Sequence, residues 1–117
     1  MKIQTTFKKI DTSEFLKTYI EDKLNRLDKL LDTPAMAEVM FRTEKLRNIV
    51  EINLVGDHLN VYASEAQENM TAAIDLAVDK VRKQITKNKE KLISRREQKK
   101  NRAANLFVAL AEKGPGL

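Results

Sequence analysis

Two kinds of hydrophobic pattern alternate along the chain, and the first has the period of a β-strand. Apolar and polar side chains alternate in residues 2–8, 37–42, 50–54 and 59–63, which predicts four strands. Strict alternation is typical of a sheet with one face on a core and the other in water. The strands are therefore expected to form a sheet with one covered face.

The second pattern has the period of a helix and occurs after the first strand and after the last. Ser13 is a good N-cap for the first helix, and Pro34 is expected to end it. Asn69 caps the second, which meets no Gly or Pro before residue 113 and is expected to reach about residue 100. Such a helix would be about 46 Å long and would project past a core of short strands. The apolar stripes are Leu16, Ile20, Leu24, Leu27 and Leu31 in the first helix, and Met70, Ile74, Ala77, Val81, Ile85 and Leu92 in the second.

These elements predict an α+β fold with the order β-α-β-β-β-α. The first helix is long enough to cross between parallel strands, which places both helices on one face of a four-stranded mixed sheet, a two-layer sandwich. Tight turns are predicted at residues 44–48 and at Gly56-Asp57, where glycine tolerates a positive φ. We expect one domain over residues 1–95 and a basic, then apolar, extension over residues 96–117.

Charge is distributed unevenly along the chain, whose formal net charge is +5 over 117 residues. Residues 1–79 contain 10 Lys/Arg and 14 Asp/Glu, whereas residues 80–102 contain 11 and 2. The positive charge is thus concentrated in one stretch of the predicted second helix. Such asymmetry favours a polyanionic partner.

Seven of the eleven basic residues of this stretch follow one line of the helix, beside the apolar stripe. Stacked like charges cost a helix roughly 0.2–0.5 kcal/mol per pair, and an ordinary solvated face mixes signs to offset that cost. A surface that follows phosphates explains the row better than a solvated or tail-like helix does. The row comprises Lys80, Lys83, Lys87, Lys91, Arg95, Lys99 and Arg102, and Arg82, Lys89, Arg96 and Lys100 broaden it.

The chain offers little for other modes of polyanion binding. The apolar stripe is small and needed by the sheet, so insertion into a membrane is not expected. Phe7 and Phe41 are predicted on the core side, which leaves Tyr62 as the aromatic residue outside, too few for base stacking on the sheet. Recognition should rest on phosphates and shape, which favours structured RNA and leaves duplex DNA open.

Few residues of the chain are candidates for catalysis or for binding a metal. The chain has no cysteine and one histidine, His58, so we expect no metal, cofactor or small-molecule substrate. Asp75 and Asp79 share a helical face, but a role in stabilising the helix start, with Asp79 paired to Lys83, is the stronger interpretation. The chain is expected not to be an enzyme. With neither a signal peptide nor a membrane span in the sequence, we expect a cytoplasmic location.

An apolar block at residues 103–111 has two open interpretations. Either it continues the helix and docks on a protein partner or a second copy, or it is a mobile terminus. The first would make the chain a protein-interaction module whose basic helix only solubilises it. This is the alternative to a polyanion-binding function.

Several segments of the two predicted helices match a known pattern. They are Asn69-Met70-Thr71-Ala72-Ala73-Ile74-Asp75, Asp79-Lys80-Val81, Lys83-Gln84-Ile85 and Lys87-Asn88-Lys89-Glu90-Lys91-Leu92 in the second helix, and Ser13-x-x-Leu16 and Lys23-Leu24-x-Arg26-Leu27 in the first. Together they resemble the family of ribosome hibernation promoting factor and ribosome-associated inhibitor, also called sigma-54 modulation proteins. The resemblance covers residues 1 to about 95.

The resemblance implies the same fold and a factor that binds the small ribosomal subunit. Family members lie in the channel for messenger and transfer RNA across the A and P sites, place basic residues of both helices on ribosomal RNA, and block translation under stress and in stationary phase. The residues implied are Lys23 and Arg26 on the first helix and Lys80, Lys83, Lys87, Lys89 and Lys91 on the second, to which the basic row adds Arg82 and Arg95.

Two departures from the family pattern stand out. Thr71 occupies a position where the family commonly has tyrosine, so any contact of that tyrosine is missing. Some 22 residues follow the shared region, too few for the C-terminal dimerisation domain of long members. The resemblance is therefore to a short form.

Overall fold

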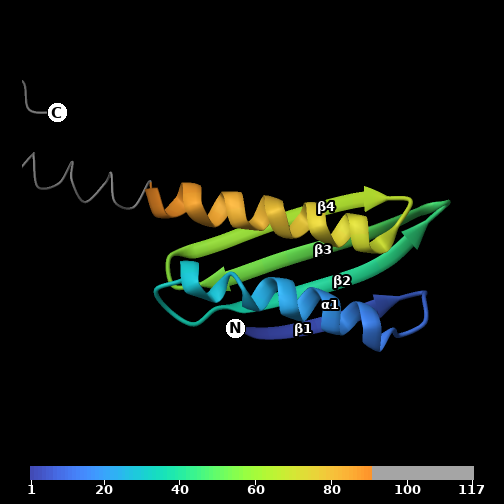
Figure 1. Ribbon diagram of the computed structural model, residues 1–117, viewed down its shortest axis with the longest axis horizontal. Helices are drawn as coiled ribbons and strands as arrows, with labels where there is room; N and C mark the ends of the chain where they lie inside the picture. The colour runs from blue at the N-terminus through green and yellow to red at the C-terminus, as the bar shows by residue number, and fades with distance from the viewer. Residues whose placement is uncertain (91–117) are drawn as a thin grey trace, which may run out of the picture. The chain divides into compact units, whose positions relative to one another are not determined.

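The elements follow one another in the predicted order β-α-β-β-β-α (Figure 1). The computed structural model describes residues 1–90, and residues 1–86 form one compact unit. The elements are β1 (Lys2–Lys8), α1 (Glu14–Asn25), a short 3-10 helix η1 (Asp28–Leu30), β2 (Met36–Glu44), β3 (Arg47–Gly56), β4 (Leu59–Gln67) and a second helix, described over residues 70–90.

The four strands form one mixed sheet in the order β1-β2-β3-β4. β1 pairs with β2 in parallel, and the two later pairings are antiparallel. The register aligns the apolar positions across the strands, so that Phe7, Phe41 and Val50 lie in one row. The Phe7 and Phe41 rings stack with centroids 4.8 Å apart. This row faces the core, as the alternation predicted.

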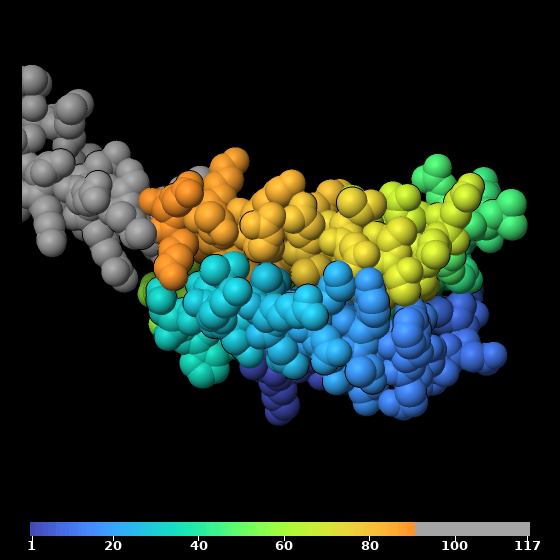
Figure 2. Space-filling view, viewed as in Figure 1, coloured from blue at the N-terminus to red at the C-terminus, as the bar shows by residue number. Residues whose placement is uncertain are grey.

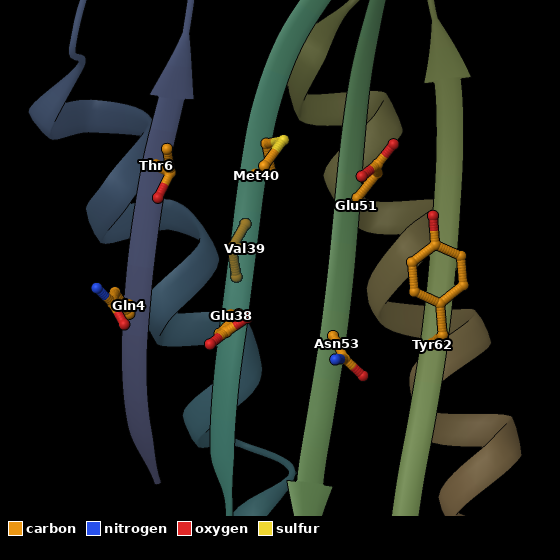
Figure 3. A pocket seen from close by; sticks show the side chains of 8 residues that line it. All are labelled: Gln4, Thr6, Glu38, Val39, Met40, Glu51, Asn53 and Tyr62. Carbon is orange, nitrogen blue, oxygen red and sulfur yellow. The ribbon is translucent and has the colours of Figure 1, made fainter.

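Both helices contribute to a single core on one face of this sheet. Ile20 and Leu24 of α1 and Ile74 and Val81 of the second helix are fully buried. Burying each such side chain stabilises the fold by about 1.5–3 kcal/mol. The other sheet face is open, with the helices behind it (Figure 3). The predicted sandwich is thus confirmed.

The start of each helix is capped as predicted. Ser13 Oγ accepts a hydrogen bond of 3.2 Å from the Leu16 N–H. Asn69 Oδ1 accepts bonds from both the backbone N–H (2.9 Å) and the hydroxyl (2.7 Å) of Thr71. Thr71 therefore reinforces the cap at the position where tyrosine was the family expectation.

The first helix ends earlier than Pro34, where its end was expected. Regular α-helix stops at Asn25, and the chain continues in tighter turns in which Leu27 N–H donates to Leu24 O (2.9 Å) and Leu30 N–H to Leu27 O (2.9 Å). A 3-10 helix repeats every three residues, so leucines spaced by three stay on one side of it. Leu27 is accordingly buried although it lies outside the α-helix.

Both predicted hairpins form, but the residues that carry their strained conformations differ from expectation. The β3–β4 loop consists of Asp57 and His58, and His58, not Gly56, has a positive φ of 56°. Gly56 still belongs to β3, where it pairs with Leu59, so the turn lies one residue further on. At the β2–β3 turn, Lys45 has a φ of 58°.

Candidate nucleic-acid interface

Within residues 1–90, the predicted basic residues lie on the two helices, which pack side by side (Figure 2). Lys23 and Arg26 belong to α1 and its C-cap, whereas Lys80, Arg82 and Lys83 belong to the part of the second helix within the compact unit. Lys87 and Lys89 are in the last described turn, which falls outside that unit. The remaining members of the row, Lys91, Arg95, Lys99 and Arg102, and the block 103–111 lie outside the described residues, as does Leu92.

Asp75 ties the two helices together. Its Oδ1 lies 2.7 Å from Lys23 Nζ and accepts a 2.7 Å hydrogen bond from the Tyr19 hydroxyl. The Lys23 ammonium also lies 5.2 Å from the centre of the Tyr19 ring, a cation–π distance. The hydrogen bond to Asp75 raises the pKa of both Tyr19 and Lys23, and Lys23 lowers the pKa of Asp75. Asp75 is therefore an ionised structural carboxylate.

Asp79 holds two cations of the second helix at once. Its Oδ1 lies 2.7 Å from Arg82 and its Oδ2 2.9 Å from Lys83, which confirms the pairing with Lys83 and adds a second partner. These contacts lower the pKa of Asp79, Arg82 contributing most. A general acid or base needs a pKa near the working pH, so this lowering argues against acid–base work by Asp79. One carboxylate for two cations leaves a net positive charge at this point.

Lys80 is held along the free edge of β4. Its Nζ forms an ion pair with Glu65 at 2.5 Å and approaches the Ser64 carbonyl oxygen at 3.5 Å. One turn later, Gln84 Nε2 donates to the Tyr62 carbonyl oxygen at 2.8 Å. The two side chains thus cover carbonyl groups that an edge strand leaves unpaired. On the second helix, Arg82 and Lys83 thus both contact Asp79, whereas Lys80 is directed to the sheet edge.

These ion pairs do not remove the cations from solvent. The side chains of Arg82 and Lys83 are 51% and 68% exposed, and that of Lys80 is 52% exposed. Exposed pairs of this kind contribute little to stability, because water screens their attraction. A phosphate can therefore replace a carboxylate at small cost, and Arg82 in particular can present a fork of donors to it.

The open sheet face carries a shallow depression of about 250 Å³. Figure 3 shows its lining side chains standing on all four strands. Tyr62 is 55% exposed there, on the outer face as predicted. The depression is lined by Gln4, Thr6, Glu38, Val39, Met40, Glu51, Asn53 and Tyr62.

Sites for other chemistry are sparse in the described part of the chain. Over residues 1–90, no group of three or more His, Cys, Asp or Glu side chains is placed to hold a metal ion. His58 is exposed beside Asp57, with 3.7 Å between Nε2 and the carboxylate. No helix within these residues combines the length and apolarity needed to cross a bilayer. The cationic helical layer is therefore the strongest candidate site.

The part of the chain just described matches a known protein family. The family model described as "Sigma 54 modulation protein / S30EA ribosomal protein" matches residues 3–93. A protein named ribosome hibernation promoting factor from Azotobacter vinelandii is 34% identical over 97 residues, which cover 83% of this chain and 91% of that protein. A protein of the same name from Escherichia coli (strain K12) is 28% identical over 92 residues, which cover 79% and 97%.

Solved structures with the same fold carry related names. The Protein Y N-terminal domain of Thermus thermophilus superposes with a TM-score of 0.70 at 28% identity, over 74% of this chain and 98% of that one. A ribosomal subunit interface protein from Coxiella burnetii superposes with a TM-score of 0.72 at 29% identity, over 77% and 99%. The element order and the sheet described above thus match those of solved structures that include a ribosomal subunit interface protein.

Proposed function

This chain belongs to the Sigma 54 modulation protein / S30EA ribosomal protein family, and from that premise we propose that it is a cytoplasmic ribosome hibernation factor that binds the small subunit. In this proposal it occupies the channel for messenger and transfer RNA across the A and P sites and blocks translation under stress. It does so by occupancy and not by catalysis. The names of its relatives, which refer to hibernation and to the subunit interface, support this assignment.

The observation that carries the proposal is the unequal pairing on the second helix. Arg82 and Lys83 share the single carboxylate of Asp79, so one positive charge is left over on an exposed helix surface. Lys23 is held against the same helix through Asp75, which brings a cation of α1 to this surface. Phosphates of ribosomal RNA would supply the missing negative charges.

The proposed contacts extend along both helices. Residues 1–95 act as the ribosome-binding domain, and residues 96–117 extend it. Lys91 and Arg95 are included among the contact residues on the basis of the sequence pattern alone. The proposed contact residues are Lys23, Arg26, Lys80, Arg82, Lys83, Lys87, Lys89, Lys91 and Arg95.

The proposal is tested with the double variant Lys83→Glu, Lys87→Glu, assayed by co-sedimentation with purified small subunits over a range of salt concentrations. Each lost phosphate contact should lower the slope of log affinity against log salt by about 0.7–0.9, so the variant should lose roughly 1.4–1.8 as well as affinity. Circular dichroism confirms that the variant is folded.

The matched control is Lys2→Glu, Lys8→Glu, which makes the same change of charge on β1. Both lysines are exposed and lie on the same face of β1 as Gln4 and Thr6, which line the open-face depression. This control should keep the wild-type slope. Equal affinity and slope for the folded helix variant and the wild type would refute the proposal.

A further inference from the structure

An exposed aromatic side chain stands beside the proposed phosphate contacts on α1. The Phe15 residue is 65% exposed. Its ring lies 5.9 Å from that of Tyr19, at an angle of 35°. From the sequence, the sheet offers Tyr62 alone for base stacking, so recognition was expected to rest on phosphates and shape. The structure places an aromatic pair in the helical layer instead.

The Tyr19 ring behind Phe15 is held in place by other contacts. Its hydroxyl donates to Asp75 of the second helix at 2.7 Å, and Lys23 lies over the ring at 5.2 Å. Phe15, Tyr19 and Lys23 are spaced by four residues, so they follow one flank of α1. A ring supported by a fixed neighbour loses little conformational freedom when a ligand stacks on it.

We propose that Phe15 stacks on an unpaired base of the RNA whose phosphates the helices bind; this inference rests on the proposed function. Stacking on an aromatic ring accepts any base, because every base has a π-face. Lys23 is eight residues, about 12 Å, further along the flank, and Arg26 is three turns, about 16 Å, along it. A single strand running beside α1 could thus place a base on Phe15 and later phosphates on Lys23 and Arg26.

The surroundings of Phe15 favour a base over a protein partner. A protein interface of ordinary size needs a contiguous apolar patch of several hundred Å². In the described residues, the other exposed large apolar side chains are on different elements: Met36, Leu46, Val55, Tyr62 and Leu76. One exposed ring, with Lys23 and Arg26 further along the helix and one acid of the same flank, Asp22, between the ring and Arg26, offers a nucleotide a stacking surface and positive charge.

Fluorescence can test the contact directly, because the chain has no tryptophan. Phe15→Trp places a single reporter at the site, and Tyr62→Trp places a matched reporter on the open sheet face. On titration with purified small subunits, with the wild-type chain as the blank, the F15W signal should be quenched by base stacking. The Y62W signal should stay unchanged. Enhanced, blue-shifted emission from F15W without quenching would indicate burial against protein and would overturn the inference.

Affinity gives an independent test. Phe15→Leu keeps an apolar side chain without a π-face and should weaken binding by roughly 5- to 150-fold, the range for loss of one base–aromatic stack. The salt slope should not change, because no phosphate contact is lost. Phe15→Trp should bind as the wild type does, and so should Tyr62→Leu.

The outcomes separate this inference from the function on which it rests. If F15L binds small subunits with wild-type affinity while the double variant at residues 83 and 87 is impaired, the stacking role is wrong and the proposed function stands. If the wild-type chain does not bind small subunits, both are wrong. Since Phe15 is exposed, F15L should fold normally, and its circular dichroism spectrum will verify this.

Discussion

Two ion-pair clusters, one on each surface of the sandwich, pair their charges in opposite proportions. In the helical layer, Arg82 and Lys83 share the one carboxylate of Asp79. On the open sheet face, the single guanidinium of Arg42 is shared by two carboxylates, Glu44 at 3.1 Å and Glu51 at 2.9 Å. The same residue types therefore leave a positive charge over in the first of these two clusters and a negative charge over in the second. A polyanion is attracted to the first and repelled by the second, a difference that the net charge of the chain does not reveal.

The surfaces also differ in what lies beneath them. The helical layer covers the core, whereas side chains of the open face have water on one side. Ile74→Ala should therefore lower the free energy of unfolding by about 2–5 kcal/mol, because Ile74 is fully buried. The open-face variant Thr6→Ala, at an exposed position of β1, should change it by no more than about 0.5 kcal/mol. Urea denaturation measures both, and similar losses would show that the two faces are not energetically distinct.

A smaller effect is expected at the start of the second helix. Asn69→Ala removes a side-chain oxygen that accepts two hydrogen bonds from Thr71, and should cost about 0.5–2 kcal/mol in the free energy of unfolding. Thr71→Val removes only the hydroxyl donor and should cost less. Thermal denaturation compares the two. A larger loss for T71V than for N69A would mean that the Asn69 side chain is not the cap.

Most of the fold could be predicted because it follows from local patterns. Alternation specified the core face of each strand, and the spacing of leucines specified the buried side of α1. The patterns did not predict where regular helix gives way to tighter turns. The leucines at 24, 27 and 30 fit both a helix of 3.6 residues per turn and a 3-10 turn, so the sequence could not show that the α-helix ends at Asn25.

The site could be predicted only where its contacts are local. The pairing of Asp79 with Lys83 follows from a spacing of four residues on one helix. The contact between Asp75 and Lys23 joins residues 52 positions apart and depends on how the two helices pack. Phe15 was missed for a related reason. A helix pattern identifies the side that faces the core, but not whether the flank beside it is covered.

Affinity for the small subunit should respond to loss of the carboxylate in the helical layer but not to loss of one on the open sheet face. Asp79→Asn removes the internal competitor for Arg82 and Lys83, and should tighten binding about two- to fivefold, as expected for release of an exposed ion pair. Glu44→Gln, the matched change on the open face, should leave affinity unchanged. Both are measured by co-sedimentation at fixed salt. Weaker binding by D79N would mean that the carboxylate positions the two cations for phosphate and does not compete with it.

The smallest expected effect concerns Asp75, the carboxylate that joins the helices, and it depends on pH. Lys23, and after it the Tyr19 hydroxyl, holds the pKa of Asp75 below its ordinary value of 3.8. The folded protein therefore binds this proton less readily than the unfolded chain does. The resulting stability is complete above pH 3.8 and is lost as the pH falls through the lower pKa of the folded state.

Asp75→Asn should accordingly flatten this acid limb of the unfolding free energy, and at neutral pH it should cost less than about 1 kcal/mol, because the carboxylate is 47% exposed. Lys23→Met should flatten the limb in the same way, since it removes the main cause of the lowered pKa. Urea midpoints between about pH 2 and pH 7 measure both variants and their combination, in the form of a double-mutant cycle. If the effects of D75N and K23M simply add, the two side chains do not stabilise the fold through each other, and the ion pair does not help to hold the helices together.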